Sequence, residues 1–292
     1  MTVKSYFWLS FGPLKQTTKK HDLLSILTTA FRPLKYLFGD TKMVKNKGNV
    51  PLVFIVGVPR SGTTAIYQYL CSVPGTNYID NVMHLFYWNL GLGKRISKVL
   101  FRDVPNETLK SKHGKTWMYS WHGPSECTPF WNQFFDNSTT HSMVNRTLDK
   151  NSGRHLKESV KMLAASGDGP LVIKNLGLSL KVEVLNELFP DALFIYVQRD
   201  MQDVKRSVLR VREQMKIKPA DWWSIKPSTY SEIKSLHLEQ KVERQIFDLR
   251  KEMEVQLSNI EEHRILKLDY SSFFADSEMW LKRCVGFMKT EK

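Results

Sequence analysis

Short apolar runs alternate with amphipathic segments along most of the chain. Four runs are rich in β-branched residues and read as buried strands: Val53–Val56, Leu171–Ile173, Leu193–Val197 and Ile265–Leu268. Each run is followed by apolar residues at the spacing of one helix face. Strands that are apolar throughout and alternate with helices are typical of a parallel sheet covered on both faces. The pattern therefore predicts an α/β fold with a parallel β-sheet flanked by helices.

The helices that follow the strands can be placed from the same spacing. They are expected at Thr63–Leu70, Leu178–Leu188, Val204–Met215 and Met279–Met288. Residues 232–262 are strongly charged and carry apolar residues at helical spacing, which predicts one long outer helix. The segment 216–226 contains Pro and two Trp residues and is expected to be a surface loop.

Two regions depart from this alternation. Residues 1–48 form a basic lead-in, where leucines from Leu23 to Leu37 predict a helix that packs on its own domain or lies on a membrane surface. Pro33 disfavours a long interfacial helix. Residues 80–168 are rich in Trp, Asn and His and predict a largely helical insertion. Such an insertion forms the acceptor side of an α/β enzyme or a cap without ligand, and the whole chain, 1–292, is expected to be a single domain.

Composition narrows the class of protein. Hydrophobic residues make up 42% of the 292 residues, which excludes a disordered chain. No run approaches the length of a membrane-spanning helix, and the N-terminus is a poor secretory signal. The three cysteines, Cys71, Cys127 and Cys284, have no CxxC spacing, which argues against a disulfide framework or a zinc ribbon. A cytoplasmic location is the resulting expectation.

Charge gives the first indication of a partner. Lys and Arg number 43 against 29 Asp and Glu, for a net charge of +14, and residues 1–50 alone carry nine basic and two acidic residues. A basic balance favours phosphorylated cofactors, nucleic acid, anionic lipid or sulfated sugars as partners. A basic protein without such a partner is the alternative.

The strongest motif is the octet Gly57–Thr64, placed directly after a predicted strand and at the start of a predicted helix. Its glycines have the spacing of a phosphate-binding loop, but Thr63 stands where nucleotide-binding loops carry lysine. Backbone N–H groups at the helix start still favour an anion. Arg60 supplies a cation inside the loop, and Thr63 and Thr64 add hydroxyl donors. The octet therefore predicts a P-loop-type anion site without the arrangement for a nucleoside triphosphate and magnesium.

A second motif follows the third predicted strand. Arg199 comes at the strand end, where open α/β sheets bind ligands, and Ser207 lies eight residues further on, in the next helix. The two side chains could contact one phosphate from two sides. An arginine followed by a serine in the next helix is common in proteins and is a weak signal by itself. Together with the Gly57–Thr64 loop, the pair becomes a specific signal for a phosphate site.

Together these segments resemble the PAPS-dependent sulfotransferase superfamily. Val53–Leu70 resembles its 5′-phosphosulfate loop, and Leu193–Val211 resembles its 3′-phosphate segment. The form PRSGTT is similar to the bacterial-type and tyrosylprotein sulfotransferase branches. The resemblance covers residues 50–75 and 168–288, and further segments are similar to family motifs: Pro170–Asn175, Leu188–Ala192, Asp269–Phe273 and Trp280–Leu281.

The resemblance implies transfer of a sulfuryl group from 3′-phosphoadenosine-5′-phosphosulfate (PAPS), a cosubstrate. It assigns the 5′-phosphosulfate to five loop residues: Arg60, Ser61, Gly62, Thr63 and Thr64. It assigns the 3′-phosphate to Arg199 and Ser207, places Lys174 at the bridging oxygen, and places Tyr270 near the cofactor. Arg60 and Lys174 would stabilise charge on the leaving phosphate, and no metal is needed because the transferred group carries less charge than a phosphoryl group.

The acceptor hydroxyl also needs a general base. Glu126 is the first candidate, because His122–Cys127 looks like the "PEE/PEC" element of bacterial-type members. Asp80 aligns where tyrosylprotein sulfotransferases carry a glutamate, and His84 lies close to it in sequence; both stay open as alternatives.

Two other functions stay open. A P-loop kinase or other NTP-dependent transferase would want lysine at position 63 and an acidic magnesium ligand at a strand end. A non-enzymatic polyanion-binding protein would use the basic surface without needing Arg60. The acceptor is expected to be a small molecule, carbohydrate, lipid or peptide and not a nucleic acid, and the scattered histidines give no metal-ligand spacing.

Overall fold

The computed structural model describes residues 30, 50–102, 104–144 and 146–289. The basic lead-in at residues 1–48, with its predicted helix, lies outside the described residues except for Ala30. Within the described part, no helix is long and apolar enough to cross a bilayer. Cys71, Cys127 and Cys284 are buried and free of disulfide bonds.

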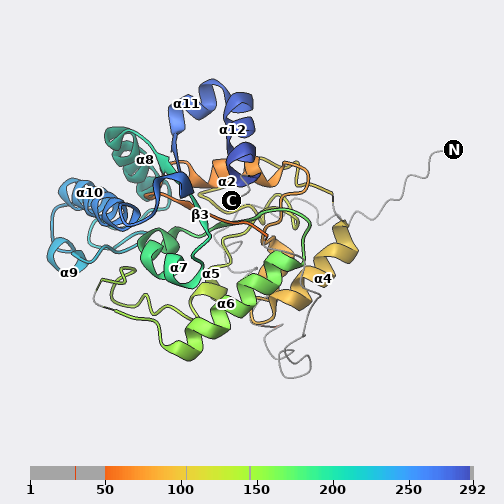
Figure 1. Ribbon diagram of the computed structural model, residues 1–292. Helices are drawn as coiled ribbons and strands as arrows, with labels where there is room; N and C mark the ends of the chain where they lie inside the picture. The colour runs from red at the N-terminus through yellow and green to blue at the C-terminus, as the bar shows by residue number, and fades with distance from the viewer. Residues whose placement is uncertain (1–29, 31–49, 103, 145, 290–292) are drawn as a thin grey trace.

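A parallel sheet forms the centre of the described part (Figure 1), with strand order β2-β1-β3-β4. Its strands are β1 (Leu52–Val56), β2 (Leu171–Lys174), β3 (Leu193–Gln198) and β4 (Ile265–Asp269). Phe54 of β1 lies opposite Ile173 of β2 and Phe194 of β3. The α/β fold and its four predicted strands are confirmed. Because the strands are parallel, their carboxyl ends meet at one edge of the sheet.

The side chains of β1 alternate between two hydrophobic cores. Leu52, Phe54 and Val56 point to one face, and Val53 and Ile55 point to the other. The first face is covered by α6 (Lys150–Ala165), α7 (Val182–Leu188), α8 (Met201–Gln214) and α10 (Leu238–Leu257). The second is covered by α2 (Thr63–Cys71), α11 (Tyr270–Ala275) and α12 (Ser277–Lys289). Burial on both faces explains why β1 is apolar throughout.

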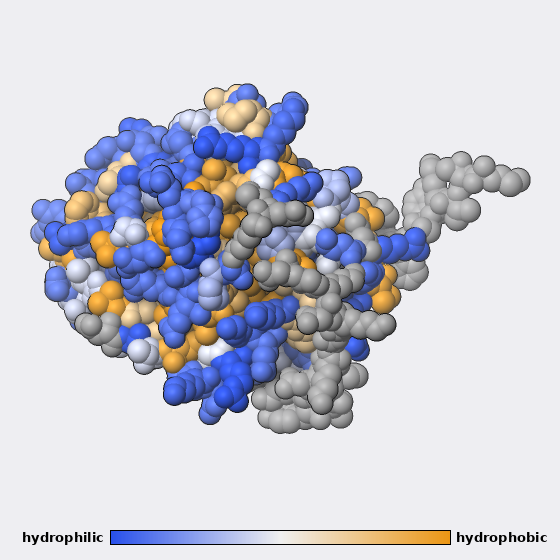
Figure 2. All heavy atoms as spheres, viewed as in Figure 1, coloured by the Kyte–Doolittle hydropathy of each residue, from blue (hydrophilic) through white to orange (hydrophobic). Residues whose placement is uncertain are grey.

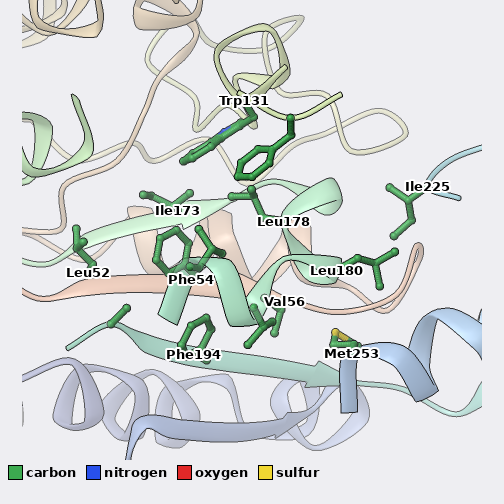
Figure 3. Packing of buried hydrophobic residues seen from close by; sticks show 14 of the residues in the cluster. Leu52, Phe54, Val56, Trp131, Ile173, Leu178, Leu180, Phe194, Ile225 and Met253 are labelled. Atoms are coloured by element: carbon green, nitrogen blue, oxygen red, sulfur yellow. The ribbon is translucent and has the colours of Figure 1, made fainter. Parts of the chain in front are cut away.

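Aromatic rings fill the first core (Figure 3). The Phe54 ring stacks on Phe194 at 5.8 Å between centroids and packs against Phe189 at 6.0 Å. Trp131 of α5 (Thr128–Trp131) belongs to the same cluster, and its indole nitrogen donates to the Glu126 carbonyl at 3.1 Å. The core therefore fixes the segment that carries Glu126.

The helix predicted at Leu178–Leu188 is divided in two. A 3-10 helix, η2 (Leu176–Leu180), precedes α7, and Lys181 between them has a non-helical φ of −133°. The Lys181 ammonium is buried and donates to the carbonyls of His141 at 2.6 Å and Gly177 at 3.1 Å. The tighter turn also directs the Ser179 hydroxyl to Gly57, whose N–H donates to it at 3.1 Å.

The prediction of one helix over residues 232–262 is wrong. The chain forms α9 (Tyr230–Ile233), turns, and starts α10 at Leu238. The Thr229 hydroxyl bonds to the Asp248 carboxylate at 2.5 Å and ties α9 back onto α10. Ile233 is buried at the turn, so the apolar spacing continues across a break that the pattern cannot show.

The insertion at residues 80–168 contains helices joined by long irregular segments. Its helices are α3 (Asn81–Leu85), α4 (Leu90–Phe101), α5 and α6. The loop predicted at 216–226 is present, and buried side chains of the neighbouring helices hold it. Arg212 donates to the carbonyls of Lys218 and Asp221 at 2.9 and 2.8 Å. One further 3-10 turn, η3 (Glu262–Arg264), precedes β4.

Candidate active site

The loop between β1 and α2 has the backbone of an anion site. Arg60 and Gly62 have φ values of 68° and 102°, in the left-handed region. A Cβ at Gly62 would lie 2.1 Å from the Tyr270 ring, so glycine is required both by φ and by the close approach of that ring. The loop therefore turns tightly under Tyr270 and directs N–H groups outward from the start of α2.

Two polar atoms at this loop are buried without a partner. Within the described residues, neither Ser61 Oγ nor Arg199 Nε makes a hydrogen bond. A buried unpaired polar group costs about 1–3 kcal/mol, which a bound anion would recover. Both atoms can donate to phosphate oxygens, so the residues present fit a phosphorylated ligand.

Two guanidinium groups meet beside the loop. Arg60 Nε donates to the Ser207 hydroxyl at 3.1 Å, and Arg199 donates to the Arg60 carbonyl at 3.2 Å. The Arg199 guanidinium also lies 4.4 Å from the centre of the Tyr270 ring. Burial lowers the pKa of Arg60, and the charge of Arg199 lowers it further. No carboxylate of the described residues forms an ion pair with either arginine, which leaves two positive charges for an anion.

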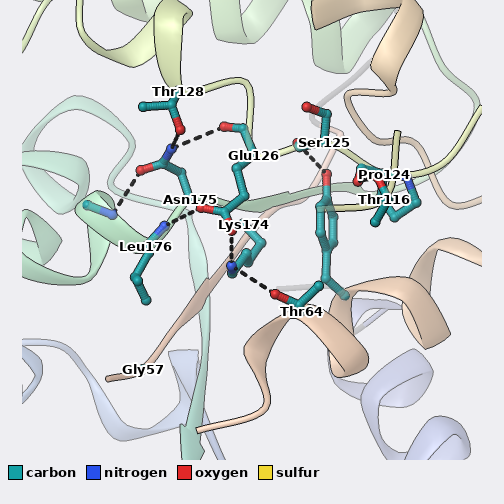
Figure 4. Close-up of polar contacts among 12 residues, drawn as sticks. Gly57, Thr64, Thr116, Pro124, Ser125, Glu126, Thr128, Lys174, Asn175 and Leu176 are labelled. Atoms are coloured by element: carbon teal, nitrogen blue, oxygen red, sulfur yellow. Dashed lines mark hydrogen bonds and ion pairs between the residues drawn. The ribbon is translucent and has the colours of Figure 1, made fainter. Parts of the chain in front are cut away.

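Lys174 and Glu126 form a second cluster, at the end of β2 (Figure 4). The Lys174 ammonium, 4% exposed, donates to Thr64 Oγ1 at 3.1 Å and forms an ion pair with Glu126 Oε1. The other Glu126 oxygen accepts from the Leu176 N–H at 3.1 Å. Asn175 donates to the Glu126 carbonyl at 3.1 Å. The structure therefore brings a predicted cation, a predicted base and the phosphate-type loop together.

His84 lies beside this cluster. Its Nδ1 is 2.8 Å from the Ser125 hydroxyl. Burial lowers the pKa of His84 to about 4; the nearby Glu126 opposes that shift, and Lys115 adds to it. The imidazole is therefore neutral near pH 7 and is electrostatically coupled to Glu126.

Asp80 has a different environment. Its carboxylate is buried, caps α3 by accepting from the Met83 N–H at 2.8 Å, and bonds to Ser97 Oγ. His122 Nδ1 is a further partner at 3.0 Å. These contacts join α3, α4 and the segment before Glu126. They do not connect Asp80 to Lys174 or to the loop.

Two residues at the site were not predicted from the sequence. Ser179 bonds to both the N–H and the carbonyl of Gly57 at 3.1 Å and fixes the start of the loop. Lys115 follows a turn in which a Cβ at Gly114 would lie 3.3 Å from Thr64 Oγ1. Burial lowers the pKa of Lys115, and Glu126 opposes that shift. The glycine within the basic stretch Lys112–Lys115 is the one sequence signal for this turn.

The described residues contain no group of three or more His, Cys, Asp or Glu side chains that could hold a metal ion. The positively charged side chains that contact the loop or its residues include Arg60, Arg199 and Lys174.

Comparisons with known proteins show the family and the fold. A model of the sulfotransferase family matches residues 51–291. Sulfotransferase STF9 from Mycobacterium avium superposes with a TM-score of 0.53 at 16% identity, over 91% of this chain and 68% of that one. Sulfotransferase STF1 from Mycobacterium tuberculosis H37Rv gives a TM-score of 0.47 at 12% identity, over 92% of this chain and 74% of that one.

A curated protein matches a shorter stretch. Adenylate kinase 8 of Rattus norvegicus is 32% identical over 81 residues, which is 27% of this chain and 16% of that protein. The chain therefore spans a small part of that relative's length. The superposition on STF9 shows the fold, and the family match over most of the chain confirms the resemblance drawn from the motifs.

Proposed function

The chain belongs to the sulfotransferase family, and from this we propose that it transfers a sulfuryl group from PAPS to a hydroxyl or amine of an acceptor, without a metal. The observation that carries the proposal is the pair of guanidinium groups, Arg60 and Arg199, that have no carboxylate partner among the described residues. They lie at the carboxyl ends of β1 and β3, where open α/β sheets bind ligands. When bound, PAPS supplies a sulfuryl group activated by a phosphate leaving group.

The loop and the end of β3 would hold the two phosphorylated ends of the cosubstrate. Arg60, Ser61 and the amides at the start of α2 are suited to the 5′ end, with the hydroxyls of Thr63 and Thr64. Arg199 and Ser207 are suited to the 3′-phosphate. The unpaired Arg199 Nε and the contact between Arg60 and Ser207 support both assignments.

Lys174 is the candidate for stabilising the leaving group. Its ammonium is buried and bonded to Thr64 Oγ1, so its charge lies at the edge of the anion site. A fixed positive charge in a site shielded from water stabilises negative charge that develops during reaction.

Glu126 is the candidate base, and His84 is the alternative. Glu126 Oε1 contacts the Lys174 ammonium, which also donates to Thr64 of the loop, and this proximity supports Glu126 as the proton acceptor. His84 is neutral at pH 7 because burial lowers its pKa to about 4, so it could also accept a proton. Asp80 is disfavoured because Met83, Ser97 and His122 already occupy its carboxylate oxygens.

Ligand-dependent stabilisation tests the cosubstrate. Thermal unfolding would be followed with 3′-phosphoadenosine-5′-phosphate (PAP), with ATP and magnesium, and with an oligonucleotide. PAP at a hundredfold excess over its Kd should stabilise the protein by about 2.7 kcal/mol. Stabilisation by ATP with magnesium instead would favour the kinase alternative, and a salt-sensitive response to oligonucleotide alone would favour a polyanion-binding protein.

A matched pair of variants tests whether the stabilisation by PAP arises at the proposed anion site. Arg199→Ala should abolish most of the PAP response, whereas Arg206→Ala on α8 should retain it, because Arg206 is exposed and paired with Asp203. An equal response in both variants would contradict the assignment of the anion site.

A further inference from the structure

Exposed apolar side chains gather at the end of α4 and in the segments beside it. Val99 and Leu100 of α4 are 81% and 59% exposed, Val104 is 57% exposed and Trp121 is 37% exposed. Isolated exposed apolar residues are ordinary, but a group of them on one surface marks an interaction site.

Contacts inside the protein show that these residues belong to one surface. His122, next to Trp121, bonds through Nε2 to the Val104 carbonyl at 2.8 Å, and its ring stacks on Phe101 at 4.7 Å. Phe101 is the last residue of α4, directly after Val99 and Leu100. The helix end and the two loops are therefore held side by side. In Figure 2 hydrophobic atoms lie among hydrophilic ones at the right margin, over the end of α4 as placed in Figure 1.

Basic side chains flank the apolar ones. Arg95, Lys98 and Val99 lie three and four residues apart, so they share one helix face, and Arg102 continues it at the helix end. All four are exposed, while Gly93 and Ser97 on the opposite side are buried. The sequence of residues 90–115 carries seven Lys or Arg against Asp103 and Glu107.

We propose that this surface, formed by Val99, Leu100, Val104 and Trp121 with Lys98 and Arg102, docks on the surface of an anionic lipid bilayer. Aliphatic residues and a Trp surrounded by cations suit the boundary between acyl chains and anionic headgroups. A protein partner of ordinary composition would more often meet an apolar centre with a mixed rim. The charge of residues 90–115 is instead predominantly positive, with seven basic residues against two acidic ones. The chain continues from this surface to the Lys112–Lys115 turn, where Gly114 lies beside Thr64.

Vesicle sedimentation of the full chain tests the proposal. The wild-type protein should bind vesicles of phosphatidylcholine mixed with phosphatidylglycerol, bind phosphatidylcholine alone weakly, and dissociate as salt is raised. Val99→Asp combined with Leu100→Asp should weaken binding by at least about tenfold, and so should Lys98→Glu combined with Arg102→Glu, because each basic residue near the bilayer contributes about 1 kcal/mol.

Matched substitutions elsewhere control for general effects. Phe247→Asp with Val255→Asp changes two exposed apolar residues of α10, and Lys234→Glu with Lys251→Glu reverses two exposed charges. Both controls should bind as the wild type does, and circular dichroism should show that every variant is folded.

Three outcomes would overturn the proposal. The first is a wild-type protein that does not bind anionic vesicles. The second is undiminished binding by both α4 variants, which would assign the lipid contact to another basic segment. The third is a self-associated wild type that the α4 variants convert to monomer without any vesicle binding, which would make the surface a contact between copies of the chain. None of these results depends on PAPS binding, so they leave the proposed function to its own test.

Discussion

The two sides of the candidate site are constructed differently. On the anion side, Arg199 directly follows β3, Arg60 lies in the short loop after β1, and β1 and β3 are adjacent parallel strands. On the other side, Glu126 and His84 belong to the insertion: Glu126 lies on irregular backbone, and His84 lies on the short helix α3. The Ser125 N–H bonds to the Ile79 carbonyl at 2.7 Å, and the Asn81 amide bonds to the Ser120 and Gly123 carbonyls at 2.8 and 2.9 Å.

On the anion side, the positions of the site residues follow from the fold. In the insertion, they follow from individual side-chain contacts. A strand-loop-helix unit places an anion site at its carboxyl end whatever else the chain contains. The insertion has no such rule, so its geometry depends on particular hydrogen bonds. Substitutions on the anion side should therefore change ligand binding, and substitutions in the insertion should change turnover or local stability.

The largest effect is expected at the candidate base. Glu126→Gln should lower kcat by about 10²–10⁴-fold, because the amide cannot accept the acceptor proton, and PAP affinity should change little. Steady-state kinetics and calorimetry with PAP would measure the two effects. His84→Asn is the comparison: a larger loss of kcat there than in Glu126→Gln would transfer the role of base to His84.

The second largest effect on turnover is expected for Lys174→Ala. It removes the cation bonded to Thr64, and kcat should fall by about 10²–10³-fold, with a smaller change in the Kd of PAP. Lys267→Ala, at an exposed position of β4, is the control and should leave kcat unchanged. Full turnover by Lys174→Ala would leave the proposed mechanism without its leaving-group cation.

Arg60→Ala and Arg199→Ala test the anion side itself. Each removes a charge-assisted hydrogen bond, which contributes about 1.5–3 kcal/mol, so PAP binding should weaken by at least about tenfold. Calorimetry would measure the affinity, and thermal unfolding without ligand would show an intact fold. Unchanged affinity in both variants is the result that the two-arginine site does not allow.

Asn81→Ala tests the side of the site that the insertion forms. The substitution leaves the Ser120 and Gly123 carbonyls without their side-chain donor and should destabilise the protein by about 1–3 kcal/mol. Turnover should fall further than PAP affinity. Urea unfolding would give the free energy of unfolding, with Asn259→Ala as control, since the Asn259 side chain is exposed and donates to the exposed Glu183 carboxylate. Equal losses of turnover and PAP affinity would show that the two sides are not separable.

The smallest effect is a pH dependence of stability from His84. Its pKa is near 6.5 in the unfolded chain and about 4 in the folded protein, so below pH 6.5 the unfolded state binds a proton that the folded state excludes. Stability should therefore be retained above pH 6.5 and fall progressively toward pH 4, by on the order of 1–3 kcal/mol. His84→Asn should flatten this slope in urea unfolding series. An unchanged slope would assign the loss to other groups.

Much of the fold was predictable because buried parallel strands leave a plain pattern. The run at Val53–Val56 predicted β1, and the glycine spacing after it predicted the loop. The helix breaks at Lys181 and before Leu238 were not predictable, since the apolar spacing runs through both. They depend on long-range bonds, from Lys181 to the His141 carbonyl and from Thr229 to Asp248.

The candidate site divides in the same way. Arg199 could be placed because it directly follows a strand, and Arg60 because it lies in the glycine-spaced loop between β1 and α2. Lys115 could not, because nothing local indicates that its turn folds over Thr64. Asp80 and Glu126 are both carboxylates in polar segments, and sequence alone does not reveal that one caps a helix while the other contacts Lys174.

The strand order also affects how the protein is made. β1 lies between β2 and β3 and is synthesised before either, so during translation its five apolar residues have no partner strand until residues past 171 and 193 leave the ribosome. The Tyr270 ring that covers Gly62 arrives later still. Non-local parallel pairing is slow, and an unpaired apolar strand is prone to aggregate. Nascent chains of this protein should therefore need a chaperone to shield β1 while the rest of the sheet is synthesised.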